Sequence, residues 1–483
     1  MTYDVVIIGS GISGLYTSIN LSEDLKVLVI SKDELKINNS YLAQGGIAVV
    51  LDKDDNYEIH INDTLIAGEH TNNIKNLDIL VKEGPIDVMK LVDIGVDFDR
   101  DEHGNLSKTL EGGHSKKRIV HHKDKTGKEV INTLLNYITN KENISTMDKT
   151  LVADINKEND LFGVVILRDE ELKTIYCKSL VLATGGIGKI YKYTTNSKIA
   201  TGDGIALAHN LGAAIKNISK IQFHPTALNL GSNERFLVSE AVRGEGAFLL
   251  NKNGNRFMLD YDERGELAPR NVVAKGIYDE SIKLNSEEIY IDISHKDSEF
   301  IKNRFPNIYD NCLKYGLDIT KDKIPVFPCE HYLMGGIDVN ENSESSIENL
   351  YAVGECSHTG IHGNNRLASN SLLEGLVFAR RAAQNINKQI KNDKSRIHNK
   401  ETKVYKKGTI SIDNNLRNKI QNIIQDSYFI VLDKEKSKKG IIEINNIITD
   451  LKSNDYIRDV DYYEIRNMAI ISKLVLGEVL NCG

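Results

Sequence analysis

Cysteine is scarce in this sequence, and its few cysteines form no recognisable framework. Their number is odd, no Cys-x-x-Cys pair occurs, and the positions are scattered along the chain: Cys177, Cys312, Cys329, Cys356 and Cys482. A disulfide framework or a zinc site would need paired cysteines at short, regular spacing. We therefore expect reduced thiols in a cytoplasmic protein, with no bound metal.

Long apolar runs are also missing. Stretches such as Val5–Ile8 and Leu180–Ala183 have the length of a strand, whereas a membrane helix needs about 18 apolar residues. The amino-terminal stretch has no basic region ahead of it and is interrupted by Gly9 and Gly11, which is atypical of a signal peptide. The sequence predicts a protein that neither enters a membrane nor is exported.

An excess of positive charge is the third absence. The chain has 61 Lys and Arg against 68 Asp and Glu residues, a formal net charge of -7. General binding to nucleic acid or to an anionic membrane surface needs the opposite balance. The basic stretch Lys116–Lys123 lacks interleaved aromatic residues, and its His121 and His122 have no second ligand cluster at a defined spacing. We interpret it as a solvated face or a support for a cofactor site, and expect neither a nucleic-acid partner nor a metal there.

What is present begins with a glycine-rich turn. The apolar segment Tyr3–Ile8 runs into a G-x-G-x-x-G motif at residues 9–14, and a second apolar segment, Lys26–Ile30, follows, which together predict a βαβ dinucleotide-binding unit. In such a unit the glycines permit the tight turn, the approach of a pyrophosphate to a helix N-terminus and close helix packing. Ser31-Lys32 stands where an acidic residue usually binds ribose hydroxyls, which weakens the case for NAD and leaves FAD open.

Later segments predict a sheet with additions. The apolar segments 180–186 and 349–355 end in or near glycine, at the edge where open α/β sheets bind ligands. Residues 220–330 have a mixed pattern, which we interpret as an inserted domain because sheet-type segments resume after it. Beyond Lys388 the sequence is rich in Lys, Asn and Ile, and its periodicity predicts helices over residues 416–428, 440–451 and 462–480. A length of 483 residues suits about three domains.

Several longer motifs occur in one order along the chain. They are Ser40–Ala48, His60–Gly68, Glu111–Ser115, Arg243–Ala247, Asp262–Arg270 and Asn365–Glu374. In these motifs the chain resembles the L-aspartate oxidases, a family of the succinate dehydrogenase and fumarate reductase flavoprotein superfamily. The resemblance covers nearly all of residues 1–385, and the carboxy-terminal tail is weakly matched.

The resemblance implies an α/β fold. A Rossmann-like FAD-binding domain over residues 1–217 and 333–400 would be split by an α+β capping domain over residues 218–332, with the active site at their junction. A shortened helical domain over residues 401–483 would follow, because family members commonly continue with a basic Glu-Ser-Arg-Gly-type segment that has no counterpart here.

FAD is the cofactor that the resemblance implies. Its contacts would be Gly9, Ser10, Gly11, Ile12, Ser13, Gly14, Lys32, Asn39, Ser40, Tyr41, Leu42, Ala43, Gln44, Gly45, Gly46, Asp203, Glu355, Ser371 and Leu372. Glu355 suits ribityl or ribose hydroxyls, and Ser371-Leu372 would begin a helix whose positive end faces the flavin. Relatives with covalent FAD use a histidine in the segment 40–46, and none occurs here, so we expect non-covalent FAD.

A four-carbon dicarboxylate needs two anion clamps, and the arginine fork matches a carboxylate. Arg270 and Arg366 lie in segments that the sequence marks as loops. A single loop arginine is usually a surface ion pair and a single histidine is usually structural. The resemblance instead implies that Arg270 is the proton donor or acceptor and that four residues hold the substrate carboxylates: His224, Ser239, His331 and Arg366. Ser239 replaces the family's common threonine and keeps its hydroxyl.

Three further assignments come from the resemblance. Glu240 and Arg243 would relay protons to Arg270, since arginine deprotonates with difficulty; the plain alternative is an ordinary i,i+3 salt bridge. Glu111 would attract the α-ammonium group that distinguishes aspartate from succinate; the alternative is a turn glutamate ahead of two glycines.

The predicted activity is therefore FAD-dependent oxidation of L-aspartate to iminoaspartate, with oxygen or fumarate as electron acceptor, the first step of de novo NAD biosynthesis. Quinolinate synthase would be a functional partner that takes the imine. Two alternatives remain: a soluble flavoprotein of the fumarate reductase or succinate dehydrogenase type, and a flavin-binding regulatory protein without turnover.

Overall fold

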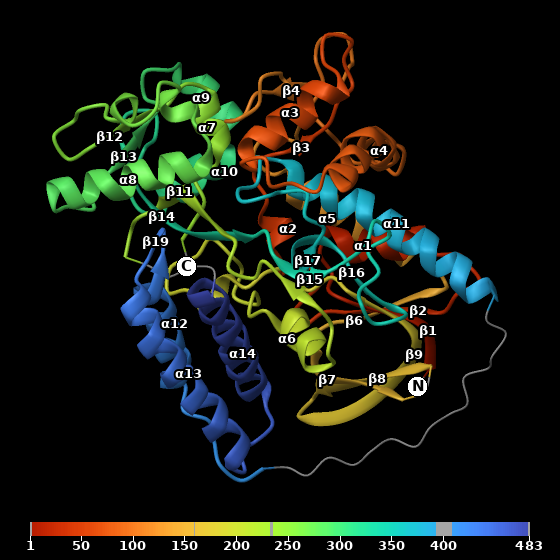
Figure 1. Cartoon of the computed structure of the whole chain (residues 1–483). Helices are drawn as coiled ribbons and strands as arrows, with labels where there is room; N and C mark the ends of the chain where they lie inside the picture. Colours follow the sequence, from red (N-terminus) through yellow and green to blue (C-terminus); the bar gives the residue numbers. More distant parts are fainter. Residues whose placement is uncertain (1, 159, 232–234, 393–407, 482–483) are drawn as a thin grey trace.

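A computed structural model describes residues 2–158, 160–231, 235–392 and 408–481 (Figure 1). At its centre lies a seven-stranded sheet in the order β6-β2-β1-β9-β8-β7, with β16 also paired to β9. The strands are β1 (Thr2–Ile8), β2 (Val27–Ile30), β6 (Ile144–Met147), β7 (Leu151–Glu158), β8 (Leu161–Arg168), β9 (Glu171–Leu182) and β16 (Leu350–Ala352). Strands β6, β2, β1, β9 and β16 are parallel, and β7 and β8 pair antiparallel. The predicted parallel strands are therefore present in one sheet.

The side chains of β1 point alternately to the two faces of the sheet, and each face packs against a different layer. Val5 and Ile7 pack with Ala382 and Ile386 of helix α11 (Asn370–Asn392) on one face, while Val6 and Ile8 belong to a larger core on the other face. Because both faces are covered at the centre of the sheet, β2 and the second half of β1 are apolar and buried. The helices of this half are α1 (Ile12–Asn20), α2 (Asn39–Leu42), α3 (Tyr57–Ala67), α4 (Ile74–Asp93), α5 (Thr126–Thr139), α6 (Asp203–Asn210) and α11 (Asn370–Asn392).

A second, antiparallel sheet has the order β11-β14-β13-β12. Its strands are β11 (Ile221–Leu228), β12 (Phe248–Leu250), β13 (Tyr290–Asp292) and β14 (Ile324–Leu333), and its helices are α7 (Glu240–Gly244), α8 (Arg270–Leu284), α9 (Ser298–Arg304) and α10 (Pro306–Leu313). These elements form the green region of Figure 1. Arg270 is the first residue of α8, with Pro269 preceding it, so the expectation that Arg270 lies in a loop is wrong.

Short pairings join these layers. The small strands are β3 (Ile47–Ala48), β4 (Lys108–Thr109), β5 (Ile119–Val120), β10 (Ile215–Lys216), β15 (Gly336–Asp338), β17 (Ser357–His358), β18 (Tyr428–Phe429) and β19 (Val431–Leu432). Single 3-10 turns lie at η1 (Gly188–Ile190), η2 (Met258–Asp260), η3 (Gly265–Leu267) and η4 (Gly354–Cys356).

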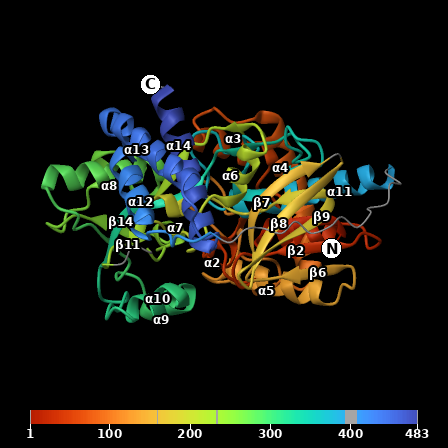
Figure 2. The ribbon, with the colours of Figure 1, turned by 90° about the horizontal axis from the view of Figure 1, so that it is seen from below.

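Three carboxy-terminal helices pack beside α6 and the inserted sheet (Figure 2). They are α12 (Asn415–Ser427), α13 (Lys434–Ser453) and α14 (Val460–Asn481), close to the three predicted segments. The expectations for residues 393–407 and for Cys482 fall outside the described residues. The predicted α/β fold class, with a helical carboxy-terminal region, is confirmed. None of the helices in the described ranges combines the length and apolar character that a membrane span requires.

Candidate active site

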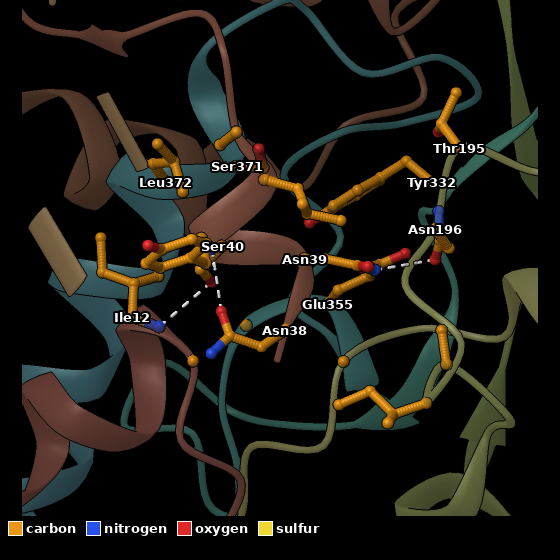
Figure 3. Close-up of a pocket in the computed structure, with 18 of the residues that line it drawn as sticks. Ile12, Asn38, Asn39, Ser40, Thr195, Asn196, Tyr332, Glu355, Ser371 and Leu372 are labelled. Carbon is orange, nitrogen blue, oxygen red and sulfur yellow. Dashed lines mark hydrogen bonds between the residues drawn. The ribbon is translucent and has the colours of Figure 1, made fainter. Parts of the chain in front are cut away.

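A cavity of about 600 Å³ opens where both sheets meet. Ligand sites commonly have volumes of about 300–1,000 Å³. Its wall takes residues from the carboxyl ends of β1 and β2, from β11 and β14, and from the start of α11, so segments far apart in the sequence converge there (Figure 3). Of the site residues predicted from the sequence, all except Gly14 and Arg243 line this cavity.

The glycine turn after β1 forms one end of the cavity. Gly9 has φ +121°, and a Cβ there would lie 2.0 Å from the Ala183 carbonyl oxygen, so only glycine fits. A Cβ at Gly11 would meet only the Ser40 side chain, which leaves the backbone open to a ligand. A Cβ at Gly14 would lie 2.0 Å from the Gly9 oxygen. Gly14 therefore packs the helix on the turn and does not line the cavity.

The segment that follows β2 is fixed by side-chain amides. Asn38 caps α2 by accepting from the Tyr41 amide at 2.9 Å. Asn39 donates to Asn196 Oδ1 at 2.8 Å, across the cavity wall, and Ser40 Oγ accepts from the Ile12 amide at 3.1 Å (Figure 3). These bonds hold residues 39–41 beside the glycine turn, and all of residues 39–46 line the cavity.

Glu355 lies in η4, three residues after the last residue of β16. Its Oε1 accepts from the Leu333 amide at 3.0 Å, and burial raises the pKa of this carboxyl to about 7. A carboxyl with this pKa accepts hydrogen bonds from ligand hydroxyls most strongly once it is ionised, and such bonds lower its pKa.

Two histidines from adjacent strands meet in the cavity. His224 on β11 and His331 on β14 have ring centroids 4.9 Å apart. His224 Nδ1 accepts from the Thr226 amide at 3.2 Å, so Nε2 carries the proton, and that Nε2 is buried with no partner among the described residues. Burial and the nearby Arg270 hold the pKa of both rings well below the usual range. Both histidines are thus neutral, and His224 offers a free N–H to a ligand.

Arg366 lies in the loop before α11 and reaches across the cavity. Its Nη1 donates to Ser371 Oγ at 2.9 Å, its Nη2 donates to His331 Nε2 at 3.1 Å, and its guanidinium lies 4.1 Å from the centre of the Tyr332 ring. Because His331 Nε2 accepts, its Nδ1 donates to Thr195 Oγ1 at 2.7 Å. Burial and Arg270 lower the pKa of Arg366 to about 10, and its Nε has no partner among the described residues.

Glu240 lies between two arginines. Its Oε2 is 2.5 Å from Arg270 Nε, and its Oε1 is 2.7 Å from Arg243 Nη2. Burial alone would raise the pKa of Glu240, but the two arginine charges lower it. Arg243 is fully buried behind Glu240 and does not line the cavity, whereas Arg270 does. The ordered contacts run from Arg243 through Glu240 to Arg270, as a proton relay requires.

Glu111 lies in the same cavity and is 3% exposed. Its Oε2 accepts from Ser369 Oγ at 2.6 Å. A Cβ at Gly45 would lie 2.8 Å from Glu111 Oε1, and one at Gly112 would lie 2.4 Å from Glu240, so these glycines leave room for the two carboxylates. Burial and the Glu240 charge raise the pKa of Glu111, while the Ser369 hydroxyl opposes that rise.

Ser239 is the N-cap of α7. It is 3% exposed, and its hydroxyl accepts from the Ala241 amide at 3.3 Å. The hydroxyl hydrogen remains free to donate toward the cavity, which Ser239 lines.

Several residues of the site were missed from the sequence. Gln222 accepts from Arg270 at 3.0 Å and donates to the Arg366 carbonyl at 2.8 Å, joining the two arginines. It lies two residues before His224 on β11, so the period of a strand predicts that both face the same side. Tyr332 and Ser369 adjoin predicted residues, but Thr195 carries no signal in the sequence.

The donor set fits an anionic flavin nucleotide and a dicarboxylate. The open backbone at Gly11 suits a pyrophosphate, and the start of α11 at Asn370 suits a flavin. The carboxyl of Glu355 suits the hydroxyl groups of the flavin nucleotide. The unpaired donors on His224 and Arg366 suit a carboxylate. Within the described ranges, no group of three or more His, Cys, Asp or Glu is arranged to hold a metal ion.

Comparison with known proteins gives consistent matches. The family model "FAD binding domain" matches residues 4–372. The chain is 49% identical to an L-aspartate oxidase of Clostridium perfringens over 392 residues, which are 80% of this chain and 88% of that protein. It is 38% identical to an L-aspartate oxidase of Yersinia pestis over 500 residues, covering 98% and 92% of the two chains. A solved quinol fumarate reductase of E. coli matches with a TM-score of 0.90 and 28% identity, over 99% of this chain and 89% of that one.

Proposed function

The chain belongs to the L-aspartate oxidases, within the succinate dehydrogenase and fumarate reductase flavoprotein superfamily, and we propose that it oxidises L-aspartate to iminoaspartate. FAD is its cofactor. The observation that carries the proposal is the buried carboxylate of Glu111 in the same cavity as Arg366 and His224. The cationic Arg366 and the N–H donor of His224 suit the carboxylates of any four-carbon dicarboxylate. The Glu111 carboxylate, in contrast, suits a substrate that carries an ammonium group.

FAD, when bound, supplies the two-electron acceptor for the hydride that leaves Cα of the substrate. The residues that would hold it are the turn at residues 9–13, the segment 39–46, Glu355, and Ser371 with Leu372 at the start of α11. The segment 39–46 contains no histidine, which supports non-covalent binding. The inserted elements between residues 218 and 332 contribute the opposite wall, and we propose that they act as a capping domain.

Substrate orientation falls to the residues around the two histidines. The free Nε2–H of His224 and the free Nε–H of Arg366 are buried donors that a substrate carboxylate would satisfy. Ser239 and His331 also line the cavity. We propose that the Ser239 hydroxyl completes the carboxylate contacts, whereas His331, whose two ring nitrogens are already used by Arg366 and Thr195, acts on the substrate by holding Arg366 in place. Holding both carboxylates fixes Cα in one position, which is a large source of rate enhancement.

Proton movement falls to Arg270. Loss of a hydride from Cα and of protons from the ammonium group produces the C=N bond. Arg270 touches Glu240 and lines the cavity, so it can pass a proton from the substrate nitrogen toward Glu240 and Arg243. With fumarate as electron acceptor, the same groups would deliver a proton to the substrate carbon.

The second candidate is a soluble fumarate reductase or succinate dehydrogenase-type activity. The fold likeness to a quinol fumarate reductase and the carboxylate clamps favour it. Anaerobic addition of L-aspartate to the purified yellow protein tests both, by the visible absorbance of the flavin. Bleaching by aspartate supports the proposal, bleaching by succinate alone supports the second candidate, and no bleaching by either supports a binding protein without turnover.

The product suggests a partner. Iminoaspartate hydrolyses readily in water, so an enzyme that consumes it would act close by. We propose quinolinate synthase in this role, since the family catalyses the first step of de novo NAD biosynthesis, and L-aspartate, fumarate and oxygen are the proposed small-molecule partners.

A further inference from the structure

The carboxy-terminal helix α14 reaches the wall of the cofactor cavity through two polar side chains. Glu464 Oε1 lies 2.5 Å from Lys32 Nζ, and Asn467 Nδ2 donates to Asp203 Oδ1 at 2.9 Å. Glu464 is 9% exposed and Asn467 is fully buried. They are three residues apart and therefore project from one face of the helix. Figure 1 shows α14 running beside α6, which begins at Asp203.

Lys32 and Asp203 both line the cavity, at the end of β2 and the start of α6. Lys32 Nζ lies 2.8 Å from Asp203 Oδ2 and donates to Thr201 Oγ1 at 2.7 Å, in addition to its contact with Glu464. An ammonium group has three N–H donors. All three donors of Lys32 are thus used by the protein, so its position is set by these partners, one of which lies on α14.

Glu464 is itself held from a second carboxy-terminal helix. Arg417 of α12 lies 2.7 Å from Glu464 Oε2. Burial alone would lower the pKa of Lys32, but Asp203 and Glu464 raise it, so the ammonium stays charged. Neither Arg417, Glu464 nor Asn467 lines the cavity. A continuous set of charge contacts therefore joins two helices outside the cavity to two residues in its wall.

We propose that Glu464 and Asn467 are positioning residues for FAD, through which the carboxy-terminal helices set the affinity for the adenosine end of the cofactor. The end of the second strand is where a dinucleotide ribose lies in a βαβ unit. Displacing Lys32 or Asp203 changes the wall at that point. By linkage, bound FAD stabilises the docking of α14 to the same extent that docked α14 stabilises FAD.

A pair of matched variants tests this role. Glu464→Gln keeps the side-chain volume and removes the charge that holds Lys32, so the dissociation constant of FAD, measured by titrating FAD into flavin-free protein, should rise about tenfold. The control is Glu478→Gln, because Glu478 Oε2 accepts from the Ser219 amide at 2.6 Å and docks α14 away from Lys32. Glu478→Gln should change the constant less than about twofold. No rise in Glu464→Gln, or an equal rise in both variants, overturns the proposal.

A second measurement needs no variant. Amide hydrogen exchange of the wild-type protein, with and without FAD, should show slower exchange in α14 and α6 when FAD is bound. Unchanged exchange in α14 contradicts the coupling. Neither experiment involves substrate, so a protein that binds FAD regardless of Glu464 overturns this inference and leaves the proposed aspartate oxidation intact.

Discussion

At the scale of single residues, the role proposed for Glu111 is to select which dicarboxylate reacts. Its carboxylate is buried and touches Ser369 Oγ, so it has one protein hydrogen bond and capacity for an ammonium group. We expect Glu111→Gln to lower kcat/KM for L-aspartate about 100-fold, because a buried charge contact is lost, and to change fumarate reduction less than about threefold. Steady-state rates with each substrate measure both effects, and equal losses would contradict the role.

The Ser369 hydroxyl lowers the pKa of Glu111, and the backbone of Ser369 is strained. Its φ is +59°, a conformation that glycine adopts more readily than serine. Ser369→Gly removes the hydroxyl that stabilises ionised Glu111, so the pKa of Glu111 should rise and the acidic limb of the kcat/KM profile for aspartate should move to higher pH. The fold should tolerate the change.

A matched serine provides the control for that experiment. Ser343 also has positive φ, at +61°, is buried, and donates to the Phe378 carbonyl away from the cavity. Ser343→Gly should leave the pH profile in place. An acidic limb that stays fixed in Ser369→Gly, or that moves equally in both variants, would refute the tuning role.

At the scale of elements, the beginnings of two helices bring together the residues of the proposed proton path. The five-residue helix α7 places Glu240 and Arg243 on one face, and α8 begins with Arg270 beside them. We expect Glu240→Gln to lower kcat for fumarate reduction at least about tenfold with little change in KM, because proton delivery slows while the carboxylate clamps remain. Glu245→Gln, at the end of the same helix and paired with Arg304, is the control. If the Glu240→Gln variant reduced fumarate at the wild-type rate, a proton relay through Glu240 would be excluded.

Elements that carry a local apolar or helical period were predictable from the sequence. The segments of β1, β2, α12 and α14 fall within two residues of their predicted bounds, because those segments carry a clear apolar period. Helix α13 begins at Lys434, six residues before the predicted start at residue 440. The length of β9 was not predictable, since residues 171–177 pair with β8 and only its last three residues, Leu180–Leu182, belong to the continuous apolar run. The helix beginning at Arg270 was missed because Pro269 reads as a loop signal, although proline also precedes and begins helices.

The site was only partly predictable from the sequence, because it depends on contacts between segments that lie far apart in the chain. Motifs located many of the residues that line the cavity, but they missed Thr195 and Tyr332 and did not separate Gly14 and Arg243, which do not line it. The contact between Lys32 and Glu464 joins positions 432 residues apart (464 minus 32), and no local pattern encodes it.

At the scale of the whole molecule, a net charge of -7 coexists with a site for anions. The positive charge around the proposed substrate is local: three buried arginines (Arg243, Arg270 and Arg366) lie near two buried carboxylates (Glu111 and Glu240), an excess of one positive charge among these five residues. Burial makes this small excess effective, because charges interact more strongly away from water. The negative net charge therefore argues against general binding of anions over the surface, but it is compatible with one buried site for an anion.

The same burial predicts how stability depends on pH. Burial raises the pKa of Glu355 to about 7 and that of Glu330 to about 8, far above the value of about 4.3 in an unfolded chain. Between pH 7 and 8 the folded state therefore binds more protons at these sites than the unfolded state, and stability falls as the pH rises. The pKa values of the buried His224 and His331 are lowered, so these rings destabilise the folded state only where the unfolded chain binds protons at them, below about pH 6.5. They therefore do not affect stability between pH 7 and 8.

We expect the free energy of unfolding of the flavin-free protein to fall by about 1 kcal/mol between pH 7 and 8, measured by denaturant titration at each pH. Glu330→Gln, which mimics the protonated carboxyl, should remove most of that fall, since Glu330 Oε2 only accepts from Thr194 Oγ1 and its Oε1 has no partner among the described residues. Glu280→Gln is the control, because the pKa of buried Glu280 is lowered and that carboxyl is ionised in both states across this window. A slope that Glu330→Gln leaves unchanged would show that Glu330 is ionised in the folded protein at neutral pH.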